Sequence, residues 1–269
     1  KAFPNVVIID NGSKDGTAAE MRRCIPHARL IERCDNIGFG SANNQAMEQV
    51  RTPFALLLNP DCSIDPADLS ILMDTLERYP TAGAIAPQSR RANGVAQRCF
   101  RQAFYEVPRN KGPYQIAGGT CCAGWLHGCC LLLRTEAFKR IDGFDENFFL
   151  YYEDDDLCLR LQRAGFACLF EPRAGARHLG GASSTSSLRT SFIKSFHYAR
   201  SRHLAIHKYL GSRASGIYLA KILLAAVPAT LLYTILLQRK YAVRWLAWGC
   251  AAVSSAFARC ALGTKRKPD

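Results

Sequence analysis

The stretch "NVVIIDNGSKDGTAAEMRRC", Asn5 to Cys24, decides the fold class. Its first six residues form a short, β-branched apolar run that ends in Asp-Asn-Gly, which predicts a buried strand followed by a turn. Residues 15–24 then predict a helix. A buried strand followed directly by a helix is the first part of a β-α-β unit, which is the building block of parallel sheets.

The same alternation continues along the chain. Further strands are expected at "ARLIER" (28–33), "PFALLLN" (53–59) and "AGAIAP" (82–87), and further helices at "GSANNQAMEQVR" (40–51) and "DPADLSILMDTLERY" (65–79). Asp65 is the expected N-cap of the last helix, with Pro66 at its first position. This order predicts an α/β fold with a doubly wound, mostly parallel sheet, in which ligands bind at the carboxyl ends of the strands.

Beyond residue 87 the pattern is less regular. Asn93-Gly94 predicts a hairpin. A strand is expected at "WLHGCCLLL" (125–133), a helix at "EDDDLCLRLQRAGF" (153–166), a strand at "ACLFEP" (167–172), a loop at "GARHLGGASS" (175–184) and a long basic helix from residue 187. The cysteines and histidine at 121–130 lack the spacing of a structural zinc motif, and the scattered cysteines predict reduced thiols in a cytoplasmic compartment.

The charge of the chain, +13 overall, is unevenly distributed. Residues 1–170 hold 19 Lys+Arg and 20 Asp+Glu, whereas residues 171–269 hold 16 and two. Such a basic region suits an anionic partner, either nucleic acid or a membrane surface. The apolar runs at 222–237 and 245–258, flanked by bases and tryptophans, favour a membrane surface and no nucleic acid, with a buried pair of core helices as the alternative. Whether the region spans the membrane or lies on it stays open.

Four adjacent acids, Glu153 to Asp156, directly follow the apolar stretch "FFLYY". Adjacent carboxylates repel one another, and low-dielectric aromatic surface should raise at least one pKa. The run therefore indicates a helix start, which the helix dipole favours, or a site that needs a proton acceptor. Asp10 and Asp61 also end apolar strands, and at Asp61 a divalent cation could bridge a carboxylate and a diphosphate.

Five stretches in order resemble the family 2 glycosyltransferases, nearest to the rhamnosyltransferase-like branch of bacterial polysaccharide biosynthesis. They are "VVIIDNGSKDGT", "NIGFGSANNQAM", "LLLNPDCSIDP", "GCCLLLRTEAFKRIDGFDENFFLYYEDDDLCLRLQRAGF" and "ARHLGGASS". The resemblance implies a GT-A fold and inverting transfer of a sugar, rhamnose as the best single guess, from a dTDP- or UDP-sugar. It also implies a divalent metal, Mn²⁺ or Mg²⁺, and a lipid-linked or polysaccharide acceptor.

The resemblance assigns five residues to the donor. Asp10 would contact the nucleobase, and Asn36 and Gly38 would shape the nucleotide pocket. Asn59 and Asp61 stand where many relatives have an Asp-x-Asp metal motif, so Asp61 would hold the cation and Asn59 would be a weaker, neutral substitute.

The remaining roles fall at the end of the domain. His178 matches a family histidine that can complete the metal or diphosphate site. Asp154 matches the general base of an inverting transfer, and Glu153 would position the acceptor or the base. The aromatic stretch before them is expected to keep the pKa of the base in a range that suits a proton acceptor. Asp156 is expected to be structural.

We therefore expect a GT-A catalytic domain at residues 1–187 and a C-terminal helical, membrane-associated region at residues 188–269. Family members begin with a strand and a helix before the stretch "VVIIDNGS", so the chain is expected to lack this first strand and helix. The expected location is the cytoplasmic face of a bacterial plasma membrane, peripheral or C-terminally anchored. Two alternatives remain: a nucleotidyltransferase with a similar sheet, and an inactive, membrane-binding relative.

Overall fold

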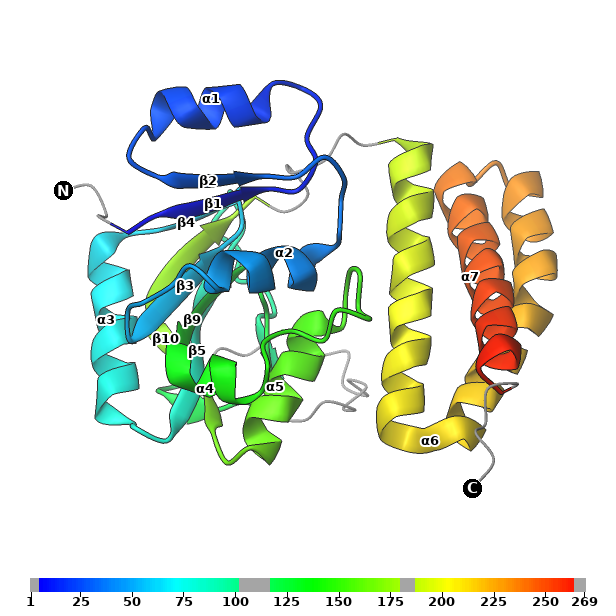
Figure 1. Cartoon of the computed structure of the whole chain (residues 1–269). Helices are drawn as coiled ribbons and strands as arrows, with labels where there is room; N and C mark the ends of the chain where they lie inside the picture. Colours follow the sequence, from blue (N-terminus) through cyan, green and yellow to red (C-terminus); the bar gives the residue numbers. More distant parts are fainter. Residues whose placement is uncertain (1–4, 102–116, 180–186, 264–269) are drawn as a thin grey trace. The chain divides into compact units, whose positions relative to one another are not determined.

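A computed structural model describes residues 5–101, 117–179 and 187–263. The chain forms two compact units (Figure 1), of which the first contains all the strands. The first, the sheet unit, comprises residues 1–147 and 153–183. The second, the helical unit, comprises residues 148–152 and 184–269. The chain thus enters the helical unit for residues 148–152 and returns to the sheet unit at Glu153. The division predicted from the sequence, into a catalytic domain at residues 1–187 and a membrane-associated region at residues 188–269, stays a prediction.

The strands are β1 (Val7–Asp10), β2 (Arg29–Glu32), β3 (Phe54–Leu58), β4 (Cys62–Ile64), β5 (Ala82–Arg90), β6 (Phe100–Arg101), β7 (Cys121–Cys122), β8 (Trp125–Leu126), β9 (Cys130–Arg134) and β10 (Ala167–His178). The helices are α1 (Thr17–Cys24), α2 (Phe39–Met47), α3 (Pro66–Arg78), α4 (Thr135–Arg140), α5 (Glu153–Arg163), α6 (Leu188–Ile235) and α7 (Arg239–Gly263). All strands and helices predicted up to residue 87 are present, with ends that differ by a few residues.

The sheet unit has the predicted α/β class, and its sheet is mixed. β1 pairs with β2 in parallel, and the main sheet has the order β3-β9-β5-β10-β4. β5 and β10 are parallel, while β9 runs antiparallel to both β3 and β5. β3, β5 and β10 therefore point in one direction, with β9 inserted in reverse between the first two. β4 closes the edge, antiparallel to β10.

Both faces of this sheet are buried, as the continuous apolar runs predict. Along β9, Leu131 and Leu133 pack with α4 and α5, while Leu132 between them packs with α3. The alternation follows from the two-residue period of a strand. Helix α3 thus covers one face of the sheet, and α4 and α5 cover the opposite face (Figure 1).

Two strand predictions were wrong. The stretch 125–133 is not one strand: β8 pairs with β6, whereas β9 pairs with β3 and β5. Between them, the His127 N–H donates to the Cys99 carbonyl and the Cys129 carbonyl accepts from the Asn59 N–H, so the backbone there bonds to two different neighbours. The predicted loop at 175–178 is instead the end of β10, which resumes pairing with β5 after an irregularity between Glu171 and Gly175.

The hairpin and the helix start that were predicted from local sequence are both present in the structure. Gly94 has a φ of 78° and its N–H donates to the Arg91 carbonyl, closing the predicted hairpin at Asn93-Gly94. Asp65 is the extended N-cap residue of α3 and Pro66 begins the helix, although the Asp65 side chain makes no capping hydrogen bond.

Glu171 is a fully buried carboxylate at the irregularity in β10. Arg173 donates to it from Nη2 at 2.7 Å and from Nε at 2.9 Å, and Thr120 Oγ1 donates at 2.7 Å. Burial alone would raise the pKa of Glu171, but the hydrogen bonds from Arg173 and Thr120 outweigh it and lower the pKa to about 2. The ionised carboxylate is therefore part of the folded sheet.

We expect Glu171→Gln to lower the free energy of unfolding at pH 7 by about 1.5–3 kcal/mol, the usual value of hydrogen bonds to a charged group. Because the pKa in the folded state lies below the ordinary value of 4.5, this contribution is full above about pH 4.5 and is lost as the pH falls toward 2. Urea unfolding at pH 7 and pH 3 should show a smaller difference between variant and parent at pH 3. Glu77→Gln, at an exposed position, is the control. An equal difference at both pH values would refute this account.

The helical unit consists of α6, which is broken at Gly211 (φ 84°), and α7. The second part of α6 packs on α7 through Leu219, Ile222 and Ala252. A side chain could not replace the hydrogen of Gly249, since a Cβ there would lie 2.9 Å from Ala226 Cβ. The helices therefore approach closely at small residues.

The aromatic segment 148–152 packs with these helices. The ring of Phe149 stacks on His197 at 4.2 Å between centroids, Tyr151 and Tyr152 contact Tyr198, and Ser201 donates to the carbonyl of residue 150 at 2.8 Å. These contacts lie within the helical unit, and the effect predicted for this stretch on the base stays a prediction.

Large apolar side chains remain exposed at the end of α6. They are Leu223, Leu224, Val227, Leu231, Leu232, Ile235, Leu236 and Leu237, and we call them the apolar end of α6. Of the helices described, α6 is the one long and apolar enough to cross a membrane, by length and composition.

Candidate functional site

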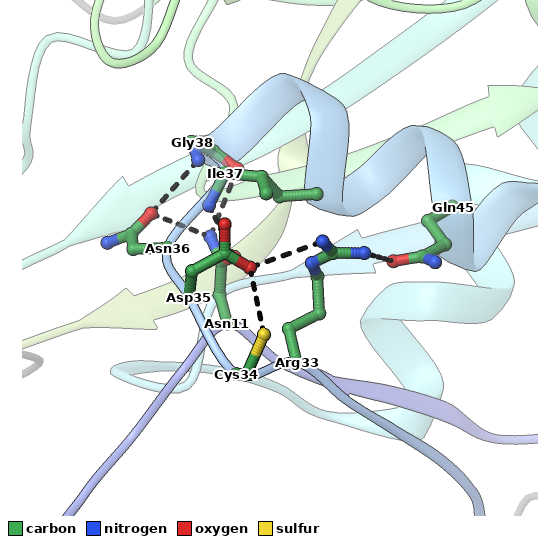
Figure 2. A network of polar contacts seen from close by, with 8 residues as sticks. All are labelled: Asn11, Arg33, Cys34, Asp35, Asn36, Ile37, Gly38 and Gln45. Carbon is green, nitrogen blue, oxygen red and sulfur yellow. Dashed lines mark hydrogen bonds and ion pairs between the residues drawn. The ribbon is translucent and has the colours of Figure 1, made fainter.

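The first part of the site is a loop held by a side chain that the sequence analysis did not single out. Asn11, directly after β1, donates from Nδ2 to Asn36 Oδ1 at 3.0 Å and to the Gly38 carbonyl at 3.1 Å. Its Oδ1 accepts from the Ile37 N–H at 3.0 Å. Figure 2 shows Asn11 at the centre of these contacts. Asn36 and Gly38 are thus placed beside the end of β1, where the buried Asp10 lies.

Two further features keep this loop in position. Arg33 donates to Asp35 at 3.2 Å and to Gln45 at 3.4 Å, which ties the loop to α2 (Figure 2). Gly12 has a φ of +85°, and a Cβ on it would lie 2.8 Å from the backbone carbon of Asp35. Only glycine suits both the conformation and the close approach.

The loop lies near the acidic run of α5 (Glu153 to Asp156), because Phe39 at the start of α2 and Asp154 both contact Gly128. A Cβ on Gly128 would lie 3.4 Å from Asp154 Cβ and 3.8 Å from Phe39 Cε1, so these three residues are neighbours. The Gly128 N–H donates to Asp154 Oδ2 at 3.2 Å. Phe39 follows Gly38 directly, and the nucleotide-pocket candidates and the base candidate therefore belong to one site.

Asp61 and His178 meet at the edge between β4 and β10. His178 Nε2 lies 3.5 Å from Asp61 Oδ1, and the N–H of residue 179 donates to the Asp61 carbonyl at 2.9 Å. His178 Nδ1 lies 3.1 Å from Gln97 Oε1. Burial lowers the pKa of His178 and the neighbouring His127 lowers it further, whereas Asp61 opposes the shift. A neutral imidazole is the form that binds metals.

His127 joins the two halves of the site. Its ring centroid lies 5.5 Å from that of His178, and the next residue is Gly128, which contacts Asp154. Its Nδ1 accepts from the Cys129 N–H at 3.2 Å. In the sequence, His127 was considered only as a possible zinc ligand. Its place near Asp61 and Asp154 depends on the bend between β8 and β9, which no local pattern predicts.

The four acids of α5 have different surroundings. Asp155 forms an ion pair with Arg101, and Asp156 accepts from Arg160 Nε at 2.6 Å. Glu153 is buried, and its Oε2 has no hydrogen-bond partner among the described residues. Asp154 is the one member of the run that is not buried. The run is thus both a helix start and a site with one accessible carboxylate.

Burial and the charge of Asp154 raise the pKa of Glu153 well above its ordinary value. The same two causes also raise the pKa of Asp155, although its ion pair with Arg101 opposes the shift. The raised pKa values agree with the repulsion predicted for adjacent carboxylates. Asp155 and Asp156 have arginine partners and Glu153 is buried, which leaves Asp154 as the candidate proton acceptor.

The residues suit a divalent cation that also binds a diphosphate. Among the residues that the structure describes, no three His, Cys, Asp or Glu side chains are grouped to hold a metal by themselves. Asp61 and His178 supply one carboxylate and one imidazole, whose facing atoms are 3.5 Å apart. Magnesium-type sites commonly use one or two protein carboxylates and take other ligands from substrate phosphates and water. Asn59 is half-buried and lies two residues before Asp61.

Residues 3–142 match the model of a family described as "Glycosyl transferase family 2", and residues 124–179 match one described as "N-terminal domain of galactosyltransferase". The N-acetylglucosaminyl-diphospho-decaprenol L-rhamnosyltransferase of Mycobacterium tuberculosis is 31% identical over 248 residues, which cover 81% of this chain and 78% of that protein. The rhamnosyltransferase WbbL of Escherichia coli is 28% identical over 197 residues, covering 65% and 73%.

Among solved structures, the mannosyltransferase PcManGT of Pyrobaculum calidifontis, in complex with GDP-Man and Mn²⁺, superposes with a TM-score of 0.57. The two chains are 18% identical, and the match covers 95% of this chain and 78% of that one. This likeness confirms the predicted GT-A fold.

Proposed function

This chain belongs to glycosyltransferase family 2, and we propose that it transfers rhamnose, with inversion, from a dTDP- or UDP-sugar to a lipid-linked saccharide acceptor. Family membership makes it a glycosyltransferase and removes the nucleotidyltransferase alternative. The observation that carries the proposal is the similarity over most of the chain to a rhamnosyltransferase whose name gives a lipid diphosphate acceptor. Asp154, as the accessible acid of α5, supports an active enzyme over an inactive relative.

In this proposal the donor lies along the first half of the site. The buried Asp10 carboxylate would accept from the imide N–H of uracil or thymine, and the loop of Asn36 and Gly38, held by Asn11, would line the nucleotide. Asp61 and His178 would hold a Mn²⁺ or Mg²⁺ ion, with Asn59 beside them. The cation would stabilise the negative charge that develops on the leaving diphosphate.

The second half of the site would carry the acceptor. In an inverting transfer the acceptor hydroxyl oxygen bonds to the anomeric carbon as the bond from that carbon to the diphosphate oxygen breaks. Asp154 takes the hydroxyl proton, and the nucleoside diphosphate leaves with the electron pair. Because the Gly128 N–H holds Asp154 Oδ2, the carboxylate is oriented before the acceptor arrives. Glu153, the buried acid that precedes it, would position the acceptor or the base.

The helical unit would bind the cytoplasmic surface of a bacterial membrane, where a lipid-linked acceptor lies. The apolar end of α6 is exposed, and Arg239 and Lys240 follow it at the start of α7. Apolar side chains beside bases suit an interface with anionic lipids. Peripheral binding and C-terminal anchoring are both compatible with this surface.

The test is a transfer assay with the full chain. We expect product from dTDP-rhamnose and a short-chain polyprenyl-diphospho-N-acetylglucosamine, and none from UDP-glucose or GDP-mannose. Product formation should depend on Mn²⁺ or Mg²⁺ and be lost in Asp61→Ala, since the cation and its carboxylate act on the leaving diphosphate. Product from another donor alone would refute the rhamnose assignment. An unchanged rate in EDTA would refute the metal site.

A further inference from the structure

The side chain of Gln97 contacts Nδ1 of His178, the ring nitrogen that does not face Asp61. Gln97 Oε1 is a carbonyl oxygen and can only accept a hydrogen bond, and it lies 3.1 Å from His178 Nδ1. A neutral imidazole that donates from Nδ1 has its lone pair on Nε2. That atom is the one that faces Asp61 Oδ1, at 3.5 Å.

We infer that Gln97 is a positioning residue, which holds His178 as the Nδ1–H tautomer so that Nε2 and Asp61 together bind the divalent cation. With the proton on Nδ1, two acceptor atoms face each other across 3.5 Å with no hydrogen between them. A cation placed between them relieves this opposition. The other tautomer would direct an N–H at Asp61 and would remove one of the two ligands. The inference rests on the metal site proposed above.

The position of Gln97 is itself fixed by the backbone. The turn at Gly94 sends the chain back along the end of β5, where the Gln97 N–H donates to the Ser89 carbonyl at 2.8 Å. Gln88, buried to 1% exposure, donates from Nε2 to the Gln97 carbonyl at 2.9 Å. β5 runs beside β10 up to the pair Arg90 and Arg177, so Gln97 and His178 lie on adjoining strand ends. Such outer contacts orient metal ligands in proteins generally.

A different charge state would also satisfy the distances. In an imidazolium both ring nitrogens donate, so His178 could bond Gln97 and Asp61 at once and form an ion pair that needs no cation. The two states differ in the protonation of Nε2, which nitrogen NMR observes directly. In the full chain labelled at histidine, we expect His178, assigned from the spectrum of His178→Ala, to show a protonated Nδ1 and a bare Nε2 at pH 7.5.

Metal affinity is the second readout. Titration of Mn²⁺ into the full chain saturated with UDP should give an affinity that is about 10- to 100-fold weaker in Gln97→Leu, the usual effect of losing a residue that orients a ligand. Val95→Ala, an exposed position in the same hairpin, is the control and should bind as the parent does. The double variant of Gln97→Leu with His178→Ala should bind no more weakly than His178→Ala alone, because Gln97 acts through His178.

Three results would overturn the inference. They are an imidazolium or a protonated Nε2 in the parent, parental Mn²⁺ affinity in Gln97→Leu, and additive losses in the double variant. Gln97→Glu keeps an acceptor at the same place and should retain the Nδ1–H tautomer, which shows that Gln97→Leu acts through the hydrogen bond. Because neither readout involves sugar transfer, a wrong rhamnose assignment would leave both unchanged.

Discussion

Asp154→Asn is expected to lower kcat by about 10²–10⁴-fold, the usual contribution of a general base. The amide cannot take the proton of the acceptor hydroxyl, although it has nearly the same shape as the carboxylate. Its oxygen can still accept from the Gly128 N–H, which contacts Asp154 Oδ2 at 3.2 Å in the parent, so the fold should be preserved. Affinity for UDP or dTDP should stay near the parental value, because the base acts on the acceptor.

The neighbouring acids provide matched controls for this prediction. Glu153→Gln should cost much less activity, because the Glu153 side chain is buried and Asp154 is the accessible acid of the run. Asp156→Asn weakens the pair with Arg160 and should reduce thermal stability rather than kcat. Steady-state kinetics and thermal unfolding of the three variants distinguish the roles. If Asp154→Asn were active while Asp156→Asn were stable but inactive, the assignment of Asp154 as the base would be wrong.

Membrane binding is expected to fall by about 10²–10⁴-fold when Leu224 and Ile235 are both replaced by glutamate. Each side chain is more than three-quarters exposed, at 79% and 76%, and both belong to the apolar end of α6. Burying a side chain of this size in hydrocarbon contributes about 1.5–3 kcal/mol, and two such losses give the stated range. Added negative charge near anionic lipids weakens binding further.

Sedimentation with anionic vesicles at low and high salt measures this effect on the full chain. The parent should stay bound at high salt, because salt screens charges and leaves apolar burial unchanged. The double glutamate variant should bind only at low salt, through the basic side chains of the helical unit. Met73→Glu with Val95→Glu, two exposed apolar positions of the sheet unit, is the control and should behave as the parent. A parent that remains in the supernatant at low salt would show that the exposed face is no membrane surface.

The sequence by itself determined the α/β class and the order of helices and strands up to residue 87. These features depend on local patterns, such as β-branched runs and the helix start at Asp65-Pro66, which act within a few residues. The turn at Asn93-Gly94 follows from the same kind of local signal. It also predicted the family, and it brought Asp61 and His178 together through a resemblance, since no local pattern joins residues so far apart in the chain.

The tertiary structure alone decided how these parts combine. β9 is inserted in reverse between β3 and β5, because its pairing partners are chosen by sheet contacts far apart in sequence. Which acid of α5 is accessible depends on the long-range partner Arg101 and on burial, so four similar residues acquire different surroundings. Asn11, Gln97 and His127 have no pattern of their own that marks them, since each is defined by a contact made across the fold. Periodicity reports which face of an element is buried, but it carries no information about the atom that a polar side chain will meet there.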